Sequence, residues 1–342
     1  MKKKSRPILI TLNLLACLCF PLAASASPVK VETGLSVEWL SGFTMYQIGG
    51  EFSYSDGSSG SMWFPLSELV FPTNVFMTTV SLEMTVVDAF IIGGKFKHNN
   101  LFGAHDVNTY AGKMQDSDWG YFYLATNGAF WARTDSLDVF SESKAYLTAA
   151  EANFSFGYRV INKEHITYDI SIGFIYQSFD YEIRDLDQWY PSYSQYSDYL
   201  SQQYSYHIYR SGEILTYRVE YFIPTIGTTL DVMLNNLILT FSLGFSPCAC
   251  ARDTDDHLLR YKLSEGETFG FAVFSSLSLD YQLKKFVALG IFAQLTTVYT
   301  EGEQHQEQYR TYNGTAKGDI GTIENRIISR QVSLGLRLSF TF

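Results

Sequence analysis

Two short acidic clusters hold the residues of this sequence that are best suited to chemistry. The first is Asp116-Ser117-Asp118-Trp119, and the second is Asp253-Thr254-Asp255-Asp256-His257. In an extended chain, residues two positions apart point to the same side. Asp116 therefore shares a face with Asp118, and Asp253 and Asp255 share one with His257. If both faces look into the same space, two carboxylates oppose a carboxylate–imidazole pair.

Such an arrangement could activate water. A His beside an Asp is held in one tautomer and becomes a better base. Crowded carboxylates cannot all ionise freely, so some of their pKa values should rise. A water between the two pairs could then lose its proton and attack a carbonyl. The alternative is that these acidic residues are only solvated at the surface, which is the more common situation for a single acidic cluster.

The elements that position these residues are predicted to be β-strands, and the last strand is the clearest. Between Val332 and Phe342 apolar residues alternate with Ser, Gly, Arg and Thr without a break. A period of two places each set on its own face. One apolar face and one face with an arginine are typical of a strand between lipid and a polar lumen. We therefore predict a closed, antiparallel, all-β transmembrane barrel.

The rest of the chain divides into similar segments. We expect about ten strands, near 33–48, 74–86, 89–118, 146–161, 166–184, 213–232, 237–251, 268–283, 286–301 and 326–342. Short joints alternate with long polar joints near 49–73, 119–145, 185–212, 252–267 and 302–325. In outer-membrane barrels the short turns face the periplasm and the long loops face outward. Both acidic clusters then fall at the outer rim.

The second cluster raises a question of face. Every second residue from Leu237 to Phe245 is apolar and is expected to face the lipid. If this alternation continued without a break, Asp255 and His257 would also point outward. An inward site needs one extra residue, a β-bulge, between Ser246 and Arg252. Pro247 interrupts the ladder there and favours such a bulge.

Composition and the N-terminus agree with export to an outer membrane. Of the 342 residues 16% are aromatic and only 18% are charged. Residues 1–26 resemble a signal peptide, with a basic start, an apolar segment and an Ala24-Ser25-Ala26 cleavage site, and the barrel is then 27–342. A lipidation box at Cys17 is the less favoured alternative. No later segment is long and apolar enough for a transmembrane helix.

Charge excludes one class of partner. Removing residues 1–26 takes four positive charges from a net charge of −10 and leaves −14. Nucleic-acid binding needs Lys and Arg to neutralise phosphates, so we expect no nucleic-acid partner. Cationic peptides or proteins and the outer-membrane lipid are the expected partners.

At the two acidic clusters the sequence resembles the omptin family of outer-membrane endopeptidases. Asp116-Ser117-Asp118-Trp119 looks like the family's Asp-x-Asp-Trp element, and Asp253-x-Asp255-x-His257 like its Asp-x-Asp-x-His element. Strand number, chain length, the final Phe342, Leu40-Ser41-Gly42 and the segment 217–227 also agree. The resemblance implies a ten-stranded barrel that is a hydrolase acting on peptide bonds at the cell surface.

By matched position, the resemblance implies a role for each residue. His257 is the general base and Asp255 its orienting partner. Asp116 and Asp118 position water and stabilise the oxyanion while sharing a proton. Water is the nucleophile, and neither a metal nor a cofactor takes part.

The family's other sites match less completely. Many members cut after basic residues, and Asp253 matches one acid of that substrate pocket, while Tyr46 stands at the other. Asp138, or Asp135, could serve the next subsite. At the positions expected to bind lipopolysaccharide, Tyr176 fits, but Ser178, Asp180 and Glu220 do not supply the arginines. A preference for basic P1 residues and a lipopolysaccharide requirement therefore do not follow from the sequence.

Two other functions compete with the protease. A metal-dependent protease could use Cys248, Cys250, Asp255 and His257, although their spacing fits no standard zinc motif. A non-enzymatic adhesin or receptor would bind partners through its loops, including the Tyr-rich 190–209, and leave the acids idle. A general porin is disfavoured because a ten-stranded lumen is filled by side chains.

Overall fold

The structure is a computed structural model that describes residues 29–99, 109–125, 129–190 and 206–342. The predicted signal peptide at 1–26 and most of the Tyr-rich segment lie outside the described residues. The described chain is built of β-strands joined by turns, and it contains no helix that is long and apolar enough to cross a membrane.

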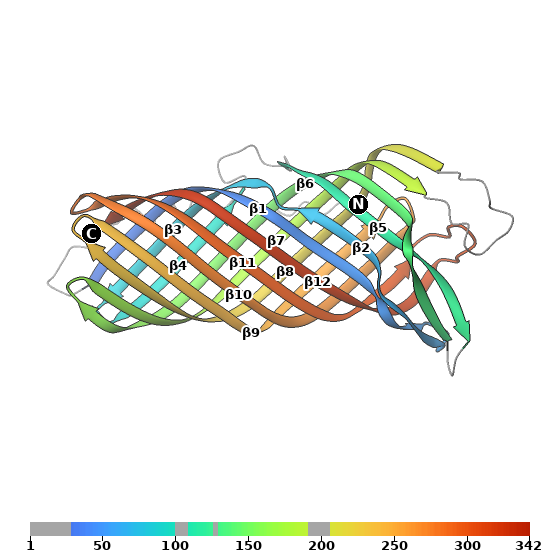
Figure 1. The fold of residues 1–342 in the computed structure, drawn as a ribbon, viewed down its shortest axis with the longest axis horizontal. Helices are drawn as coiled ribbons and strands as arrows, with labels where there is room; N and C mark the ends of the chain where they lie inside the picture. Colours follow the sequence, from blue (N-terminus) through green and yellow to red (C-terminus); the bar gives the residue numbers. More distant parts are fainter. Residues whose placement is uncertain (1–28, 100–108, 126–128, 191–205) are drawn as a thin grey trace.

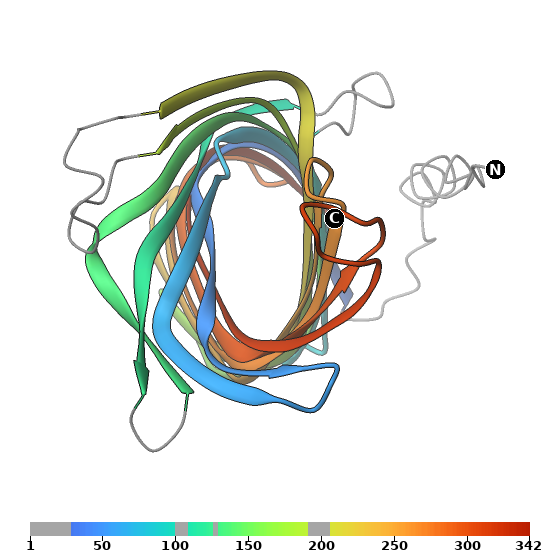
Figure 2. The same ribbon diagram turned by 90° about the vertical axis from the view of Figure 1, so that its right-hand side faces the viewer.

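Twelve strands follow one another along the chain. They are β1 (Val29–Tyr54), β2 (Ser59–Pro72), β3 (Val75–Val86), β4 (Phe90–His98), β5 (Thr109–Ala125), β6 (Ala129–Lys163), β7 (Ile166–Tyr190), β8 (Tyr206–Leu234), β9 (Leu237–His257), β10 (Lys262–Lys284), β11 (Val287–Gln308) and β12 (Gly318–Thr341). The first strand pairs with the last, so the sheet closes into a barrel (Figures 1 and 2).

The barrel nevertheless has ten strands at each height. At the short-turn end the ring runs β1, β3, β4, β6 and then β7 to β12. At the other end β2 and β5 replace β3 and β4 between β1 and β6. The predicted strand 89–118 is thus divided into β4 in the lower ring and β5 in the upper ring, and β2 forms within the predicted joint 49–73. The prediction of about ten strands is confirmed in this sense.

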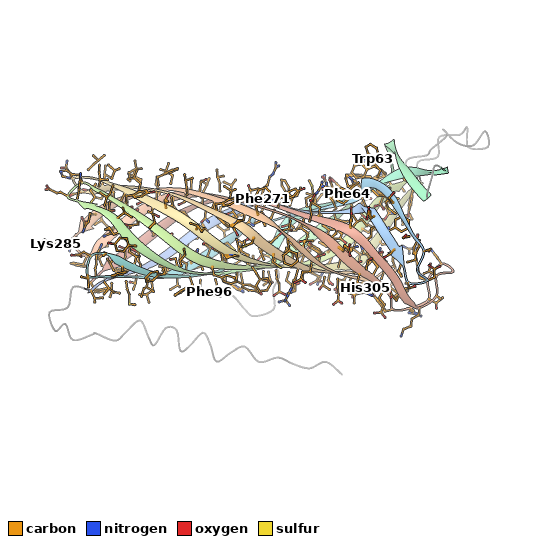
Figure 3. All side chains as sticks on the ribbon, turned by 90° about the horizontal axis from the view of Figure 1, so that it is seen from below. Trp63, Phe64, Phe96, Phe271, Lys285 and His305 are labelled. Carbon is orange, nitrogen blue, oxygen red and sulfur yellow. The ribbon has the colours of Figure 1, made fainter. Side chains whose placement is uncertain are left out.

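The long polar joints are mostly not loops. β1 continues to Tyr54, and β5 and β6 pair through the segment predicted as the joint 119–145. β9 and β10 are likewise separated only by residues 258–261. The strands therefore rise well beyond the predicted boundaries, because polar side chains on both faces suit a β-strand that stands in water as well as a loop. Figure 3 shows Lys285 at one end of this long barrel and His305 and Trp63 toward the other.

The outer surface divides into an apolar part and a charged part. Large exposed apolar side chains cover the lower strands, among them Phe76, Phe154, Ile172, Leu243, Ile291 and Leu336. Higher on the strands the outer face carries ion pairs, such as Arg252–Glu267 at 2.9 Å and Arg218–Glu220 at 2.8 Å. The lower part matches a lipid-facing band, and the charged part extends beyond it.

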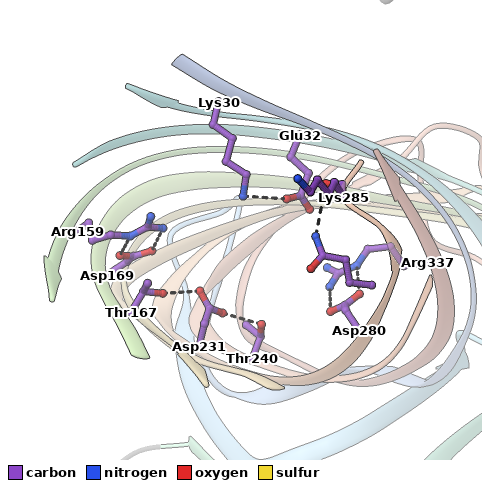
Figure 4. Close-up of polar contacts among 11 residues, drawn as sticks. Lys30, Glu32, Arg159, Thr167, Asp169, Asp231, Thr240, Asp280, Lys285 and Arg337 are labelled. Carbon is purple, nitrogen blue, oxygen red and sulfur yellow. Dashed lines mark hydrogen bonds and ion pairs between the residues drawn. The ribbon is translucent and has the colours of Figure 1, made fainter. Parts of the chain in front are cut away.

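The lumen is filled by polar side chains. Near the short turns Arg159 pairs with Asp169 at 2.9 Å, and Arg337 pairs with Asp280 (Figure 4). Farther up, the Lys97 amine lies 3.1 Å from Glu38 and 3.4 Å from Glu151. Because charges are costly to bury without partners, these contacts explain how polar groups can pack inside the barrel.

Candidate active site

The upper lumen holds a layer of buried aromatic side chains, which we call the aromatic floor. It comprises Tyr46, Phe71, Tyr181, Tyr217 and Tyr221, each at most 1% exposed. The rings of Phe71 and Tyr217 stack at 4.3 Å, and Tyr46 lies 5.6 Å from Tyr217. The floor separates the polar lumen below from the mouth of the barrel above.

A cavity of about 390 Å³ opens above this floor. Asp116 and Asp118 line it from β5, and Asp255 and His257 line it from β9. In the upper ring of ten, β5 and β9 are four positions apart, so the two acidic clusters face each other across the mouth. The rest of the lining is Tyr46, Ile48, Leu66, Ser67, Leu69, Trp119, Asp138, Val139, Arg260, Lys262 and Ser264.

The predicted bulge turns Asp255 and His257 inward. Against β10, Ala249 pairs with Gly270 and Ser246 with Ala272, so β9 has one residue more than its partner. The pairing with β8 shows the same extra residue in β9. Below the bulge Phe245 is exposed, and above it Ala249, Ala251, Asp253 and Asp255 are buried. The bulge therefore reverses the alternation, as expected from Pro247.

Asp255 and His257 form a pair. The Asp255 Oδ2 atom lies 2.9 Å from Nε2 of His257, and Asp255 is 1% exposed. The other oxygen, Oδ1, is buried and has no hydrogen-bond partner among the described protein groups. A carboxylate in this position orients the ring and stabilises the imidazolium that forms when the ring accepts a proton.

Asp116 and Asp118 form the second pair. Asp116 has a cross-strand neighbour on each side, Leu69 of β2 and Ser141 of β6. Burial raises the pKa of Asp116 well above its usual range; the charges of Asp118 and Asp255 raise it further, and Arg260 opposes them. This shift favours the protonated form of Asp116, in which the carboxyl can donate a hydrogen bond.

Asp253 and Tyr46 lie at the base of the site. The Asn325 amide donates to the Asp253 carboxyl at 3.3 Å, and burial together with Asp255 raises the pKa of Asp253 to about 8. Tyr46 lines the cavity and donates a hydrogen bond to Gln304, whereas Asp253 is not part of the lining. Burial followed by the charges of Asp255 and Asp253 raises the pKa of Tyr46.

The protonation of Asp253 has a consequence for stability. The group titrates near 3.9 in an unfolded chain and near 8 in the barrel, so between these values the folded state binds more protons. Stability then falls as pH rises through this range, by up to about 1.4 kcal/mol per pH unit for this group. We expect Asp253→Asn to reduce the fall in thermal midpoint between pH 5 and pH 8. An unchanged pH dependence in this variant would contradict the assignment.

Asp138 of β6 also lines the cavity, at its exposed edge. Partial burial and the nearby Asp118 raise its pKa. The side chain of Asp135 lies outside the described residues. Of the three substrate-binding residues predicted from the sequence, Asp138 and Tyr46 thus border the cavity, and Asp253 lies beneath it.

Two cationic residues of the cavity were not predicted. Arg260 lies in the turn between β9 and β10, and Lys262 is the first residue of β10. Lys262 pairs across the sheet with His257. Residues 252–267 were predicted from the sequence as a loop, and a loop has no cross-strand pairs. Extending the β9 strand to His257 would have predicted this pairing.

The cysteines lie on the other face of β9. Cys248 and Cys250 are free thiols; Cys248 is exposed, and Cys250 contacts Glu267 on the outer surface at 3.8 Å. Asp255 and His257 point into the barrel, so the four ligands of the metal alternative do not converge. In the described part of the chain, no group of three or more His, Cys, Asp or Glu could hold a metal ion.

The positions compared with a lipopolysaccharide site also lie on the outer surface. Tyr176 donates a hydrogen bond to Glu220, which pairs with Arg218 at 2.8 Å. Asp180 lies opposite Arg218 on the neighbouring strand. Arg252 is the cross-strand partner of Glu220. Two arginines, Arg218 and Arg252, are therefore present at this surface, at positions that the sequence analysis did not single out.

Comparison with known proteins decides the family. The model of the Omptin family matches residues 75–340, which is most of the chain. The chain belongs to the omptin family. A search of curated protein sequences finds no match.

Among solved structures, the outer membrane protease OmpT of Escherichia coli is similar with a TM-score of 0.65 and 16% sequence identity. The match covers 92% of this chain and 97% of OmpT. The FadL homologue of Pseudomonas aeruginosa also matches, at 9% identity over 91% of this chain and 90% of that one, but its TM-score is 0.28. The chain is thus an outer-membrane β-barrel with an omptin protease fold.

Proposed function

We propose that this omptin is an endopeptidase that hydrolyses peptides or proteins with water as the nucleophile. One observation carries the proposal: Asp116, Asp118, Asp255 and His257 come from segments more than a hundred residues apart, yet they line one cavity. Neither cluster would suffice alone, because water activation needs a base and a group that stabilises the negative charge of the intermediate.

The chemistry follows from the charge states of the two pairs. Water between them gives a proton to His257, whose imidazolium is stabilised by Asp255, and the water oxygen bonds to the scissile carbonyl carbon. Asp116, protonated and sharing its proton with Asp118, donates a hydrogen bond to the carbonyl oxygen as that oxygen becomes negative. His257 then returns the proton to the leaving nitrogen as the carbon–nitrogen bond breaks. No metal or covalent intermediate is needed.

The cavity is proposed to face the cell exterior. It lies at the end of the barrel opposite the short turns, beyond the apolar outer band. In outer-membrane barrels the short turns face the periplasm. The enzyme would then act on substrates outside the cell.

The P1 preference should be broader than for a pocket with two ionised acids. With a pKa of about 8, Asp253 is mostly neutral at pH 7, and Tyr46 is buried and bonded to Gln304. An uncharged carboxyl does not stabilise a cationic side chain by ion pairing. Ionising Asp253 at pH 7 costs about a factor of ten in binding of a cation, so we expect the preference of a peptide library for Arg or Lys at P1 to rise between pH 6 and pH 9. A preference that stays constant over this range would contradict the protonation assigned to Asp253.

The test of the function is cleavage of a mixed peptide library by the barrel refolded in lipid micelles. We expect cleavage at internal peptide bonds that is unchanged by EDTA, because the site needs no metal. Loss of activity in EDTA would favour a metal-dependent protease. A folded barrel that cleaves no peptide would favour an adhesin or receptor with an idle site.

A further inference from the structure

Lys262 lies beside the Asp255–His257 pair. It begins β10 directly after the turn 258–261 and is the cross-strand partner of His257. Directly opposed residues of an antiparallel pair point to the same face, with their Cβ atoms about 5 Å apart. His257 and Lys262 both line the cavity, in agreement with this rule. The amine is therefore carried on the same wall as the general base.

The charges around Lys262 come from several strands. β9 contributes Asp255 and His257, and across the cavity β5 contributes Asp116 and Asp118. The remaining titratable or charged lining groups are Asp138 from β6, Tyr46 from β1 and Arg260 from the turn. Lys262 is half-buried, and within the described part of the chain no salt bridge ties its amine to a single carboxylate. The amine is free to engage a group that enters the cavity.

Charges from both acidic pairs act on the Lys262 amine. Burial lowers the pKa of its amine, and Arg260 lowers it as well, whereas Asp255 and Asp118 raise it. One of these acids belongs to each pair. Lys262 and both pairs line one cavity, so a peptide carbonyl that is attacked by water between the pairs enters the same cavity as this amine.

We propose that Lys262 is a further catalytic residue, which donates a charge-assisted hydrogen bond to the scissile carbonyl oxygen as it becomes an oxyanion. The inference rests on the proposed endopeptidase function. Lys262 keeps its proton throughout: the carbonyl π electrons move to the oxygen, the water proton goes to His257, and the leaving nitrogen later receives it. The ammonium and the protonated Asp116 then share the charge of the oxyanion.

A role in chemistry fits the position of Lys262 better than a role in substrate affinity. Arg260, which is exposed at the rim, can attract substrate charge before binding. Lys262 lies inside, next to the base. A fixed cation at the point where negative charge develops stabilises the transition state more than the ground state, so it acts mainly on kcat.

The experiment compares Lys262→Met and Lys262→Arg with wild type in micelles, using one library-derived peptide and measuring kcat and KM from pH 5 to 10. Lys144→Met is the matched control, because Lys144 is an exposed lysine of the same upper barrel whose amine pairs with Asp185 at 2.9 Å. We expect Lys262→Met to lower kcat about 100-fold with KM changed less than threefold, and Lys144→Met to leave both unchanged.

The arginine variant separates charge from packing. Lys262→Arg should recover at least a tenth of the wild-type kcat and move the alkaline limb of the rate profile to higher pH, because a guanidinium stays charged there. If Lys262→Met does not fold, the shift of the alkaline limb in Lys262→Arg tests the inference by itself.

Three results would overturn the inference. They are a Met variant with wild-type kcat, a Met variant altered only in KM, and an Arg variant with an unmoved alkaline limb. In each of these cases the endopeptidase function survives, because wild type cleaves. An inactive wild-type barrel overturns both the function and this inference.

Discussion

Replacing His257 by Ala should lower kcat/KM by about 10³-fold or more, and Asp116→Ala should have a comparable effect. The first change removes the base that accepts the water proton, and the second removes a hydrogen-bond donor to the oxyanion; losses of this size are ordinary for such groups. The measurement is peptide cleavage by equal amounts of folded barrel in micelles.

The matched control for these variants is His305→Ala. His305 is an exposed histidine in β11 that lies 3.5 Å from Asp319, outside the cavity lining. We expect it to keep wild-type activity. If His257→Ala retains more than a tenth of the wild-type rate, another base must serve the reaction.

Deleting Pro247 should abolish cleavage although it removes no residue of the site. The deletion takes out the extra residue of β9, so the pairing with β10 becomes continuous. Every side chain above it then changes face, because a shift of one residue reverses the alternation of a strand. Asp255 and His257 would point outward, and Asp256 would point inward. We expect at least a 10³-fold loss of kcat/KM.

The deletion needs evidence that the barrel still closes. Labelling of a cysteine introduced at Thr254 supplies it: position 254 should become protected in the deletion variant if the upper strand has turned. Cys248→Ser, which keeps the bulge, should retain wild-type activity. Full activity in the deletion variant would show that the bulge does not orient the site.

Much of the site could be predicted because its signals are local. The spacing of two residues within each cluster fixes a common face in any extended strand, and Pro247 marks the point where the ladder must be interrupted. The alternation from Val332 to Phe342 likewise depends only on neighbouring residues. These features do not require knowledge of which strands pair.

The remaining features depend on pairing between distant strands. β2 and β5 complete the upper ring between β1 and β6, and their places there follow from pairing with segments that are distant in sequence. The position of Lys262 opposite His257 follows from the β9–β10 register. The neutral state of Asp253 depends on its burial and on the nearby charge of Asp255, whereas the hydrogen bond from Asn325 of β12 opposes it.

The central claim is that the two acidic pairs act on one water, and a double-mutant cycle tests it most directly. Kinetic constants would be measured for Asp116→Ala, His257→Ala and the variant carrying both changes. If the pairs act as a unit, the double variant should be about as slow as the slower single variant, because either change already disables the shared step. Losses that multiply in the double variant would show that the two pairs act independently, and single variants with wild-type rates would refute the site altogether.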